Sequence, residues 1–180
     1  MMREEELLSA AFALGFADAA VVDTSEIVFQ PAFRVCCEDN LCGKYGVNYT
    51  CPPACGTTEE MRGRILRCRR ALVLQSMWDA DDPMDSAQTA PAKRQHNQWT
   101  RALLEQSGLK GLMVGASGCS LCTPCMLERG APCRFPDRCW SCMSAYCIYV
   151  QKLAERCGMD YDCGPGCVAL FSLLCFGARD

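Results

Sequence analysis

Apolar residues recur along the chain with helical spacing in some segments and as short continuous runs in others. Residues 3–14 predict a helix, because Leu7, Ala11 and Leu14 share one face and acidic side chains occupy the first turn. The short run Asp18–Asp23 predicts a buried strand. The chain therefore opens with a helix followed by a strand.

Helices and short apolar runs continue to alternate further along the chain. Thr57 and Glu60 form a capping-box pattern, which predicts a helix through about Arg67. The other predicted strands are Arg70–Met77, Leu109–Ala116 and Cys167–Phe176. The other predicted helices are Ala92–Ser107, after a polar connection over Asp79–Pro91, and one along the stripe Met143, Tyr146, Val150, Leu153 and Cys157.

Two segments show neither the helical spacing of apolar residues nor a continuous apolar run. They are Arg34–Gly56, here named the first cysteine loop, and Ser117–Trp140, the second cysteine loop. Loops of this length are uncommon in a compact domain unless something binds them together. Alternation of helices and strands predicts an α/β fold in a single domain over residues 1–180. We expect a roughly four-stranded, mostly parallel sheet with flanking helices, and two metal-binding loops that follow strands and meet at one edge.

Charge and hydropathy narrow the class of protein. The formal net charge of −3 favours neither nucleic acid nor an anionic membrane as a partner. Residues 1–10 are acidic and polar where a secretory signal needs a basic start and an apolar stretch, and Val168–Phe176 is too short to span a bilayer. We expect a cytoplasmic protein; the sequence does not predict its oligomeric state.

Seventeen cysteines are the outstanding feature of the composition. An odd number cannot pair completely within one chain, and a reducing compartment keeps cysteines as thiols or as metal-bound thiolates. Many of them will act as small buried hydrophobic residues. The spacing of the cysteines along the chain has to distinguish metal ligands from packing residues.

The second cysteine loop carries the sharpest spacing. Cys119, Cys122 and Cys125 follow one another at intervals of three residues, and Cys133 comes just before Arg-Phe-Pro. This arrangement is typical of iron–sulfur clusters of the 4Fe–4S type, whose fourth thiolate arrives from farther away. Zinc sites more often use two separated pairs of cysteines. Zinc and a metal-free loop remain alternatives.

The first cysteine loop carries a looser pattern. Cys37, Cys42 and Cys51 are separated by four and eight residues, and Cys51 is followed by two prolines. Glycines within the loop allow tight folding, and the prolines fix the direction in which the chain leaves. A structural loop with buried thiols is the alternative to a second metal site.

Three segments carry a resemblance to a known family: CEDNLCGKYGVNYTCPPACG, GCSLCTPC with CRFP, and SAYCIYVQKLAERCG. They resemble the predicted metal-binding proteins of the domain of unknown function 2284 family, in order and over nearly the whole chain. The resemblance implies metal binding by Cys37, Cys42, Cys51, Cys119, Cys122, Cys125 and Cys133. The family tends to have a glutamate where this chain has Ser144, so a role for that carboxylate is in doubt here.

The other ten cysteines are interpreted mostly as packing residues: Cys36, Cys55, Cys68, Cys139, Cys142, Cys147, Cys157, Cys163, Cys167 and Cys175. Seven ligands fill one four-thiolate cluster and leave three for a second, whose fourth position is either Cys55 or an external ligand. The favoured function is electron transfer to a redox partner protein. The alternatives are an enzyme with an open cluster iron, acting on a small sulfur- or oxygen-containing substrate, and a zinc-stabilised interaction module.

Overall fold

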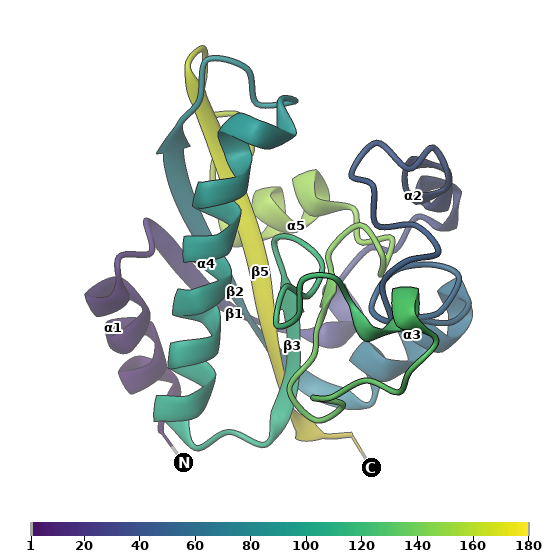
Figure 1. The fold of residues 1–180 in the computed structure, drawn as a ribbon. Coiled ribbons are helices and arrows are strands. Elements are labelled where there is room, and N and C mark those ends of the chain that lie inside the picture. Colours follow the sequence, from purple (N-terminus) through teal and green to yellow (C-terminus); the bar gives the residue numbers. More distant parts are fainter. Residues whose placement is uncertain (1, 180) are drawn as a thin grey trace.

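The computed structural model describes residues 2–179, and Figure 1 shows their arrangement. The helices are α1 (Glu4–Leu14), α2 (Arg34–Glu38), α3 (Thr58–Leu66), α4 (Ser86–Ser107) and α5 (Val150–Cys157), with short 3-10 turns at Thr24–Glu26, Pro31–Phe33 and Met126–Arg129. The strands are β1 (Asp18–Asp23), β2 (Cys68–Asp79), β3 (Gly111–Gly115), β4 (Ser141–Cys142) and β5 (Cys167–Ala178). No helix within residues 2–179 is both long and apolar enough to cross a membrane.

The strands form one five-stranded sheet in the order β1-β2-β5-β3-β4. Only the β3–β4 pair is parallel, while β1–β2, β2–β5 and β3–β5 are antiparallel. The α/β class is confirmed, but the expected four-stranded, mostly parallel sheet is wrong. Strands β2 and β3, joined through α4, do run in the same direction, but the last strand, β5, inserts between them in the opposite direction.

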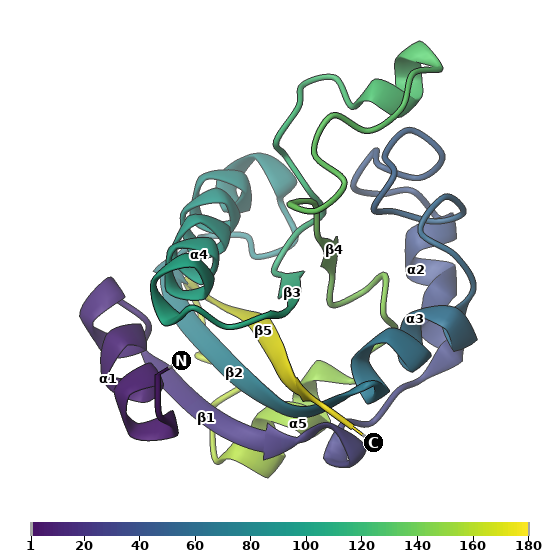
Figure 2. The same ribbon diagram turned by 90° about the horizontal axis from the view of Figure 1, so that it is seen from below.

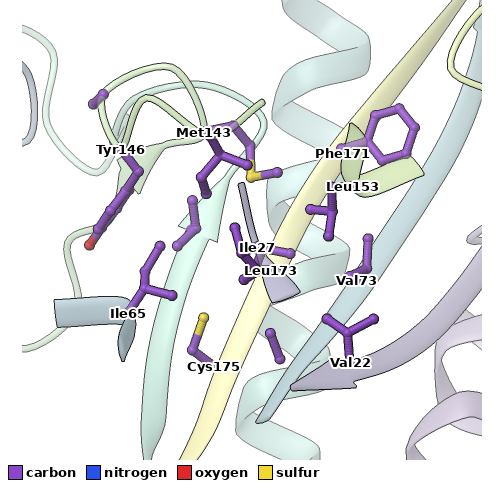
Figure 3. Close-up of a cluster of buried hydrophobic side chains, with 14 of the residues drawn as sticks. Val22, Ile27, Ile65, Val73, Met143, Tyr146, Leu153, Phe171, Leu173 and Cys175 are labelled. Carbon is purple, nitrogen blue, oxygen red and sulfur yellow. The ribbon is translucent and has the colours of Figure 1, made fainter. Parts of the chain in front are cut away.

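Helices cover both faces of the sheet (Figure 2). Alternate residues of β2 point to opposite faces, as the period of two requires. Leu72 and Leu74 join the cluster formed with α1 and α4, whereas Val73 packs on the α3 and α5 side. Figure 3 shows this second cluster, where Val73 and Leu173 of the sheet lie near Leu153 of α5. Each face of the sheet therefore has its own apolar core.

Several element boundaries differ from those that the pattern predicts. Helix α4 begins at Ser86 rather than near Ala92, because Asp85 caps it by accepting from the N–H of Ala87 at 2.7 Å, and Pro91 is accommodated inside its second turn. Helix α5 begins only at Val150, since residues 143–147 form turns and Ile148 forms a β-bridge with Phe29, although Met143 and Tyr146 still face the core. The capping box at Thr57 is confirmed, with its hydroxyl 3.2 Å from the N–H of Glu60.

One pair of cysteines departs from the expectation that all remain thiols or metal ligands. Cys163 and Cys167 form a disulfide across the turn that leads into β5, with their Cα atoms 5.7 Å apart. Gly164 and Gly166, both at positive φ, allow the chain to fold back so tightly that residues four apart can bond.

Candidate metal centre

Hydrogen bonds from three consecutive residues join the two cysteine loops. The Asn48 side chain donates to the Cys119 carbonyl at 3.0 Å, and the Thr50 hydroxyl accepts from the Cys119 N–H at 3.2 Å. The Tyr49 hydroxyl donates to the Ala131 carbonyl at 3.0 Å. Asn48 and Thr50 are buried, at 3% and 4% exposure. The expectation that the two loops meet is confirmed.

Helix α4 and Trp140 fix the two ends of the second cysteine loop. Asn97 of α4 accepts from the N–H of Ala116 at 2.9 Å and donates to the Ser117 hydroxyl at 2.9 Å. The Trp140 indole donates to the Ser117 carbonyl at 2.9 Å. A Cβ on Gly115 would lie 2.5 Å from the Trp140 ring, so this position requires glycine. The loop is therefore anchored at its base and free of helix and strand beyond it, apart from one 3-10 turn.

The second cysteine loop gathers five thiols around one small cavity. They are Cys119, Cys122, Cys125, Cys133 and Cys139, here named the second-loop thiol group, and the cavity volume is about 20 Å³. Burial, and then the nearby charges of Cys133 and Cys119, raise the pKa of Cys139 to about 11. The N–H of Phe135 points at the Cys133 sulfur at 3.4 Å. All four ligands predicted on this loop lie together, and Cys139 joins them.

The first cysteine loop faces a much larger cavity, of about 470 Å³. Cys36, Cys37, Cys42, Cys51 and Cys142 line it. Of these five, Cys37, Cys42, Cys51 and Cys142 are here named the first-loop thiol group. Burial, and then the charge of Cys142, raise the pKa of both Cys37 and Cys51 to about 12. The three cysteines predicted on this loop therefore lie together. Two further thiols line the same cavity: Cys36 of α2, and Cys142, which comes from β4.

Backbone N–H groups favour a charged sulfur at Cys142. Burial raises the pKa of Cys142, while hydrogen bonds from the N–H groups of Ala145 and Ser144 lower it. Hydrogen bonds of this kind to thiolates are a common means of stabilising metal centres. These two N–H groups offset part of the cost of burying a charged sulfur at Cys142, whose pKa remains raised.

Residues 118–123 form a common wall between the two cavities. Gly118, Ser120 and Thr123 line the larger cavity, while Cys119 and Cys122 line the smaller one. The wall is thin at Gly118, where a Cβ would lie 3.0 Å from the Cys51 sulfur. The two thiol groups are therefore back to back across a single segment of chain.

Cys55, the expected exception among the packing cysteines, lies elsewhere. It is buried in the apolar core, and its sulfur is 3.6 Å from an Arg34 guanidinium nitrogen. It does not line the larger cavity. Cys175 is fully buried in the same core, and Cys68 and Cys157 pack against it, so these three act as packing residues.

The thiols surround cavities instead of converging on a point. Among residues 2–179, no three His, Cys, Asp or Glu side chains form a group that could hold a metal ion. Tetrahedral zinc with bonds of about 2.3 Å needs its sulfurs only about 3.8 Å apart, whereas each thiolate of a cubane binds its own iron and the sulfurs are spread more widely. The donor chemistry of both groups therefore fits a thiolate-bound cluster. At the second loop, however, a cavity of about 20 Å³ is only large enough for a water or an ion, so a cluster there requires the loop to move outward.

Two residues of the thiol groups, Cys139 and Cys142, were interpreted from the sequence as packing residues. Their spacing, Cys-Trp-Ser-Cys, is itself a two-residue gap of the kind used by metal sites, and this signal could have identified them. Because an extended chain advances about 3.3 Å per residue, three residues separate Cys139 and Cys142 by roughly 10 Å. Cys139 therefore lines the smaller cavity and Cys142 the larger one.

Comparison with known proteins gives one match. A family model described as a predicted metal-binding protein (DUF2284) matches residues 20–176 of the chain, which confirms the resemblance seen in the cysteine motifs. No curated protein and no solved structure matches the chain.

Proposed function

This chain belongs to the DUF2284 family of predicted metal-binding proteins, and on that premise we propose that it is a 4Fe–4S cluster protein that transfers electrons. The observation that carries the proposal is the grouping of nine cysteines into two thiol groups on either side of one wall. When bound, such clusters accept and release single electrons. The proposal includes a redox partner protein and a cytoplasmic location, which would keep the fifteen cysteines outside the Cys163–Cys167 disulfide as thiols.

At the second loop, the proposed ligands are Cys119, Cys122, Cys125 and Cys133. Their spacing and the N–H of Phe135 that points at Cys133 support this assignment. Cys139 is a fifth thiol beside the set. At the first loop, the proposed ligands are Cys37, Cys42 and Cys51, with Cys142 in the fourth position in place of Cys55.

The small cavity at the second loop supports a second candidate, a structural zinc ion. Its volume of about 20 Å³ suits an ion, and the thiols around it would have to draw closer together to coordinate that ion. In that case Cys119, Cys122, Cys125 and Cys133 would close on zinc and stabilise the loop without redox chemistry.

The large cavity at the first loop supports a third candidate, an enzyme. A closed electron-transfer centre needs no space for a substrate. The cavity lined by Cys37, Cys42, Cys51 and Cys142 measures about 470 Å³, of which a cluster bound to these thiols would fill only a part. Cavities of this size hold small molecules. The substrate would bind beside the metal, in a space that the protein side chains leave free.

Metal and sulfide counts on protein purified without air test the proposal. About eight irons and eight sulfides per chain are expected for two clusters, with visible absorption that zinc thiolates lack. Zinc without sulfide would identify the structural alternative. Fewer than four irons per chain, with no sulfide, would contradict the proposed function.

A further inference from the structure

The cavity beside the first-loop thiol group is lined by positive charge. Lys44, Lys93 and Arg94 contribute to its wall, and none of the Asp and Glu residues within 2–179 does. Its volume of about 470 Å³ lies within the range of small-molecule pockets. The overall charge of the chain is −3, so this local excess of cations runs against the average.

The packing of α4 determines where two of these cations lie. Ser86, Ala90, Lys93 and Arg94 line the cavity, and their spacing places them on one face of the helix. A neighbouring face of the helix, with His96 and Leu103, is buried against the sheet. In Figure 2, α4 and α2 stand on either side of β3 and β4. The sheet therefore holds the helix with its cationic face toward the cavity.

The three cations have no anionic partner in the part of the chain that is described. No ion pair among residues 2–179 includes Lys44, Lys93 or Arg94, and Lys93 donates only to the Thr89 hydroxyl, at 3.0 Å. Hydroxyl groups of Ser117, Ser120 and Thr123 share the same wall and can donate further hydrogen bonds. Gathered cations and hydroxyl donors are a suitable lining for an anion.

We infer that this cavity binds a small organic anion, bearing a carboxylate or phosphate group, beside the first-loop thiol group. Lys93, Arg94 and Lys44 supply charge-assisted hydrogen bonds, and the cavity holds the remainder of the molecule. The inference names the substrate class of the enzyme candidate. Only the presence of a metal next to the anion rests on the proposed function, because the cations are independent of it.

Calorimetric titration of the metal-loaded full chain tests the inference. The probes are succinate, inorganic phosphate and butane-1,4-diol, which matches succinate in length without its charge. We expect saturable binding of at least one anion and none of the diol. Arg94→Gln and Lys93→Gln should each raise the Kd about tenfold or more, since each removes a charge-assisted hydrogen bond. Lys110→Gln, an exposed cation outside the cavity, is the matched control and should leave the Kd unchanged.

The opposite results are equally specific. Absence of binding by both anions, equal binding of the diol, or unchanged affinity in both α4 variants would overturn the inference. The iron content of the same samples distinguishes a failure of this inference from a failure of the proposed function. Anion binding by protein that contains no iron would contradict the proposed cluster and support the anion site. Iron without anion binding would support the cluster and contradict the anion site.

Discussion

The two cysteine loops offer similar ligands in very different surroundings. The second loop encloses its thiols around about 20 Å³, whereas the first loop leaves about 470 Å³ open beside Cys37, Cys51 and Cys142. Both loops lack regular structure over most of their length, and both depend on Asn48 and Thr50 for their mutual position. The difference therefore lies in what surrounds the sulfurs.

This contrast shows how one fold can leave different amounts of free space beside similar ligands. At the second loop, Phe135, Leu121 and Met126 share the lining of the small cavity with the thiols, which leaves space there for no more than an ion or a water. At the first loop, α4 contributes Lys93 and Arg94 at a distance that leaves space between. Under the proposed function, electron transfer would take place at the second loop and ligand binding at the first.

The largest expected effect is the loss of a whole cluster from the second loop. Cys122→Ser should lower the iron content by about four atoms per chain, because one thiolate of the set is removed. Cys157→Ser, a half-buried cysteine outside both loops, is the matched control and should keep all iron. An unchanged iron count in Cys122→Ser would rule out this ligand assignment.

A smaller loss should follow at the first loop, where the fourth ligand is in question. Cys142→Ser should remove one to four irons and change the paramagnetic spectrum, because it takes away a thiolate of the first-loop group. Cys55→Ser should retain the iron, since Cys55 lies in the core beside Arg34. Iron loss in Cys55→Ser together with retention in Cys142→Ser would reverse the assignment.

Asn48 offers a way to loosen both loops at once. Asn48→Ala removes the bond to the Cys119 carbonyl and those from the Thr50 N–H and hydroxyl, leaving buried groups unpaired. The expected cost is on the order of 3 kcal/mol of unfolding free energy. Hydrogen exchange should rise in both cysteine loops and not in β2 or β5. Faster exchange in one loop alone would mean that the loops are held separately.

The pH dependence of stability is expected to differ between the two cysteine loops and the part of the fold in which α4 packs on the sheet. Burial lowers the pKa of His96 to about 3, and its ring nitrogens contact the hydroxyls of Ser76 and Ser172 at 2.5 and 2.8 Å. Below the ordinary pKa of 6.5, the unfolded chain takes up a proton that the folded chain excludes, so stability falls as the pH falls. Between pH 7 and pH 5 the loss is about 2 kcal/mol.

Hydrogen exchange of α4 amides across this pH range measures the effect. His96→Gln should flatten the dependence in α4, because glutamine does not titrate. Loop amides, which report metal retention, should respond to acid in the same way in both proteins. An equally steep dependence of α4 in His96→Gln would show that another group is responsible.

Local signals in the sequence predicted the helices and strands better than their arrangement. The acidic first turn of α1 and the capping box at Thr57 are chemical requirements of a helix start, and both helices form as expected. The position of β5 between β2 and β3 depends on contacts distant along the chain, which periodicity does not encode. Strand β4 has only two residues, too few for any period to be visible.

The candidate site could be predicted in part for the same reason. Spacing predicted that Cys119, Cys122 and Cys125 lie together, because they follow one another within seven positions of the same loop. Cys142 joins the first-loop group from more than 90 residues away, through the pairing of β4 with β3. The cationic lining of the larger cavity could not be predicted from the sequence either. Lys93 and Arg94 line it only because the fold places α4 beside the cysteine loops.

The hydrogen bonds between Asn48, Thr50 and Cys119 have a consequence for the order in which the centres assemble. Once a metal orders either loop, these hydrogen bonds fix part of the conformation of the other loop. The second centre then forms at a lower entropic cost, which is positive cooperativity between two binding events. Protein carrying one filled centre should therefore be scarce, and a titration with iron and sulfide should pass steeply from the empty form to the doubly filled form.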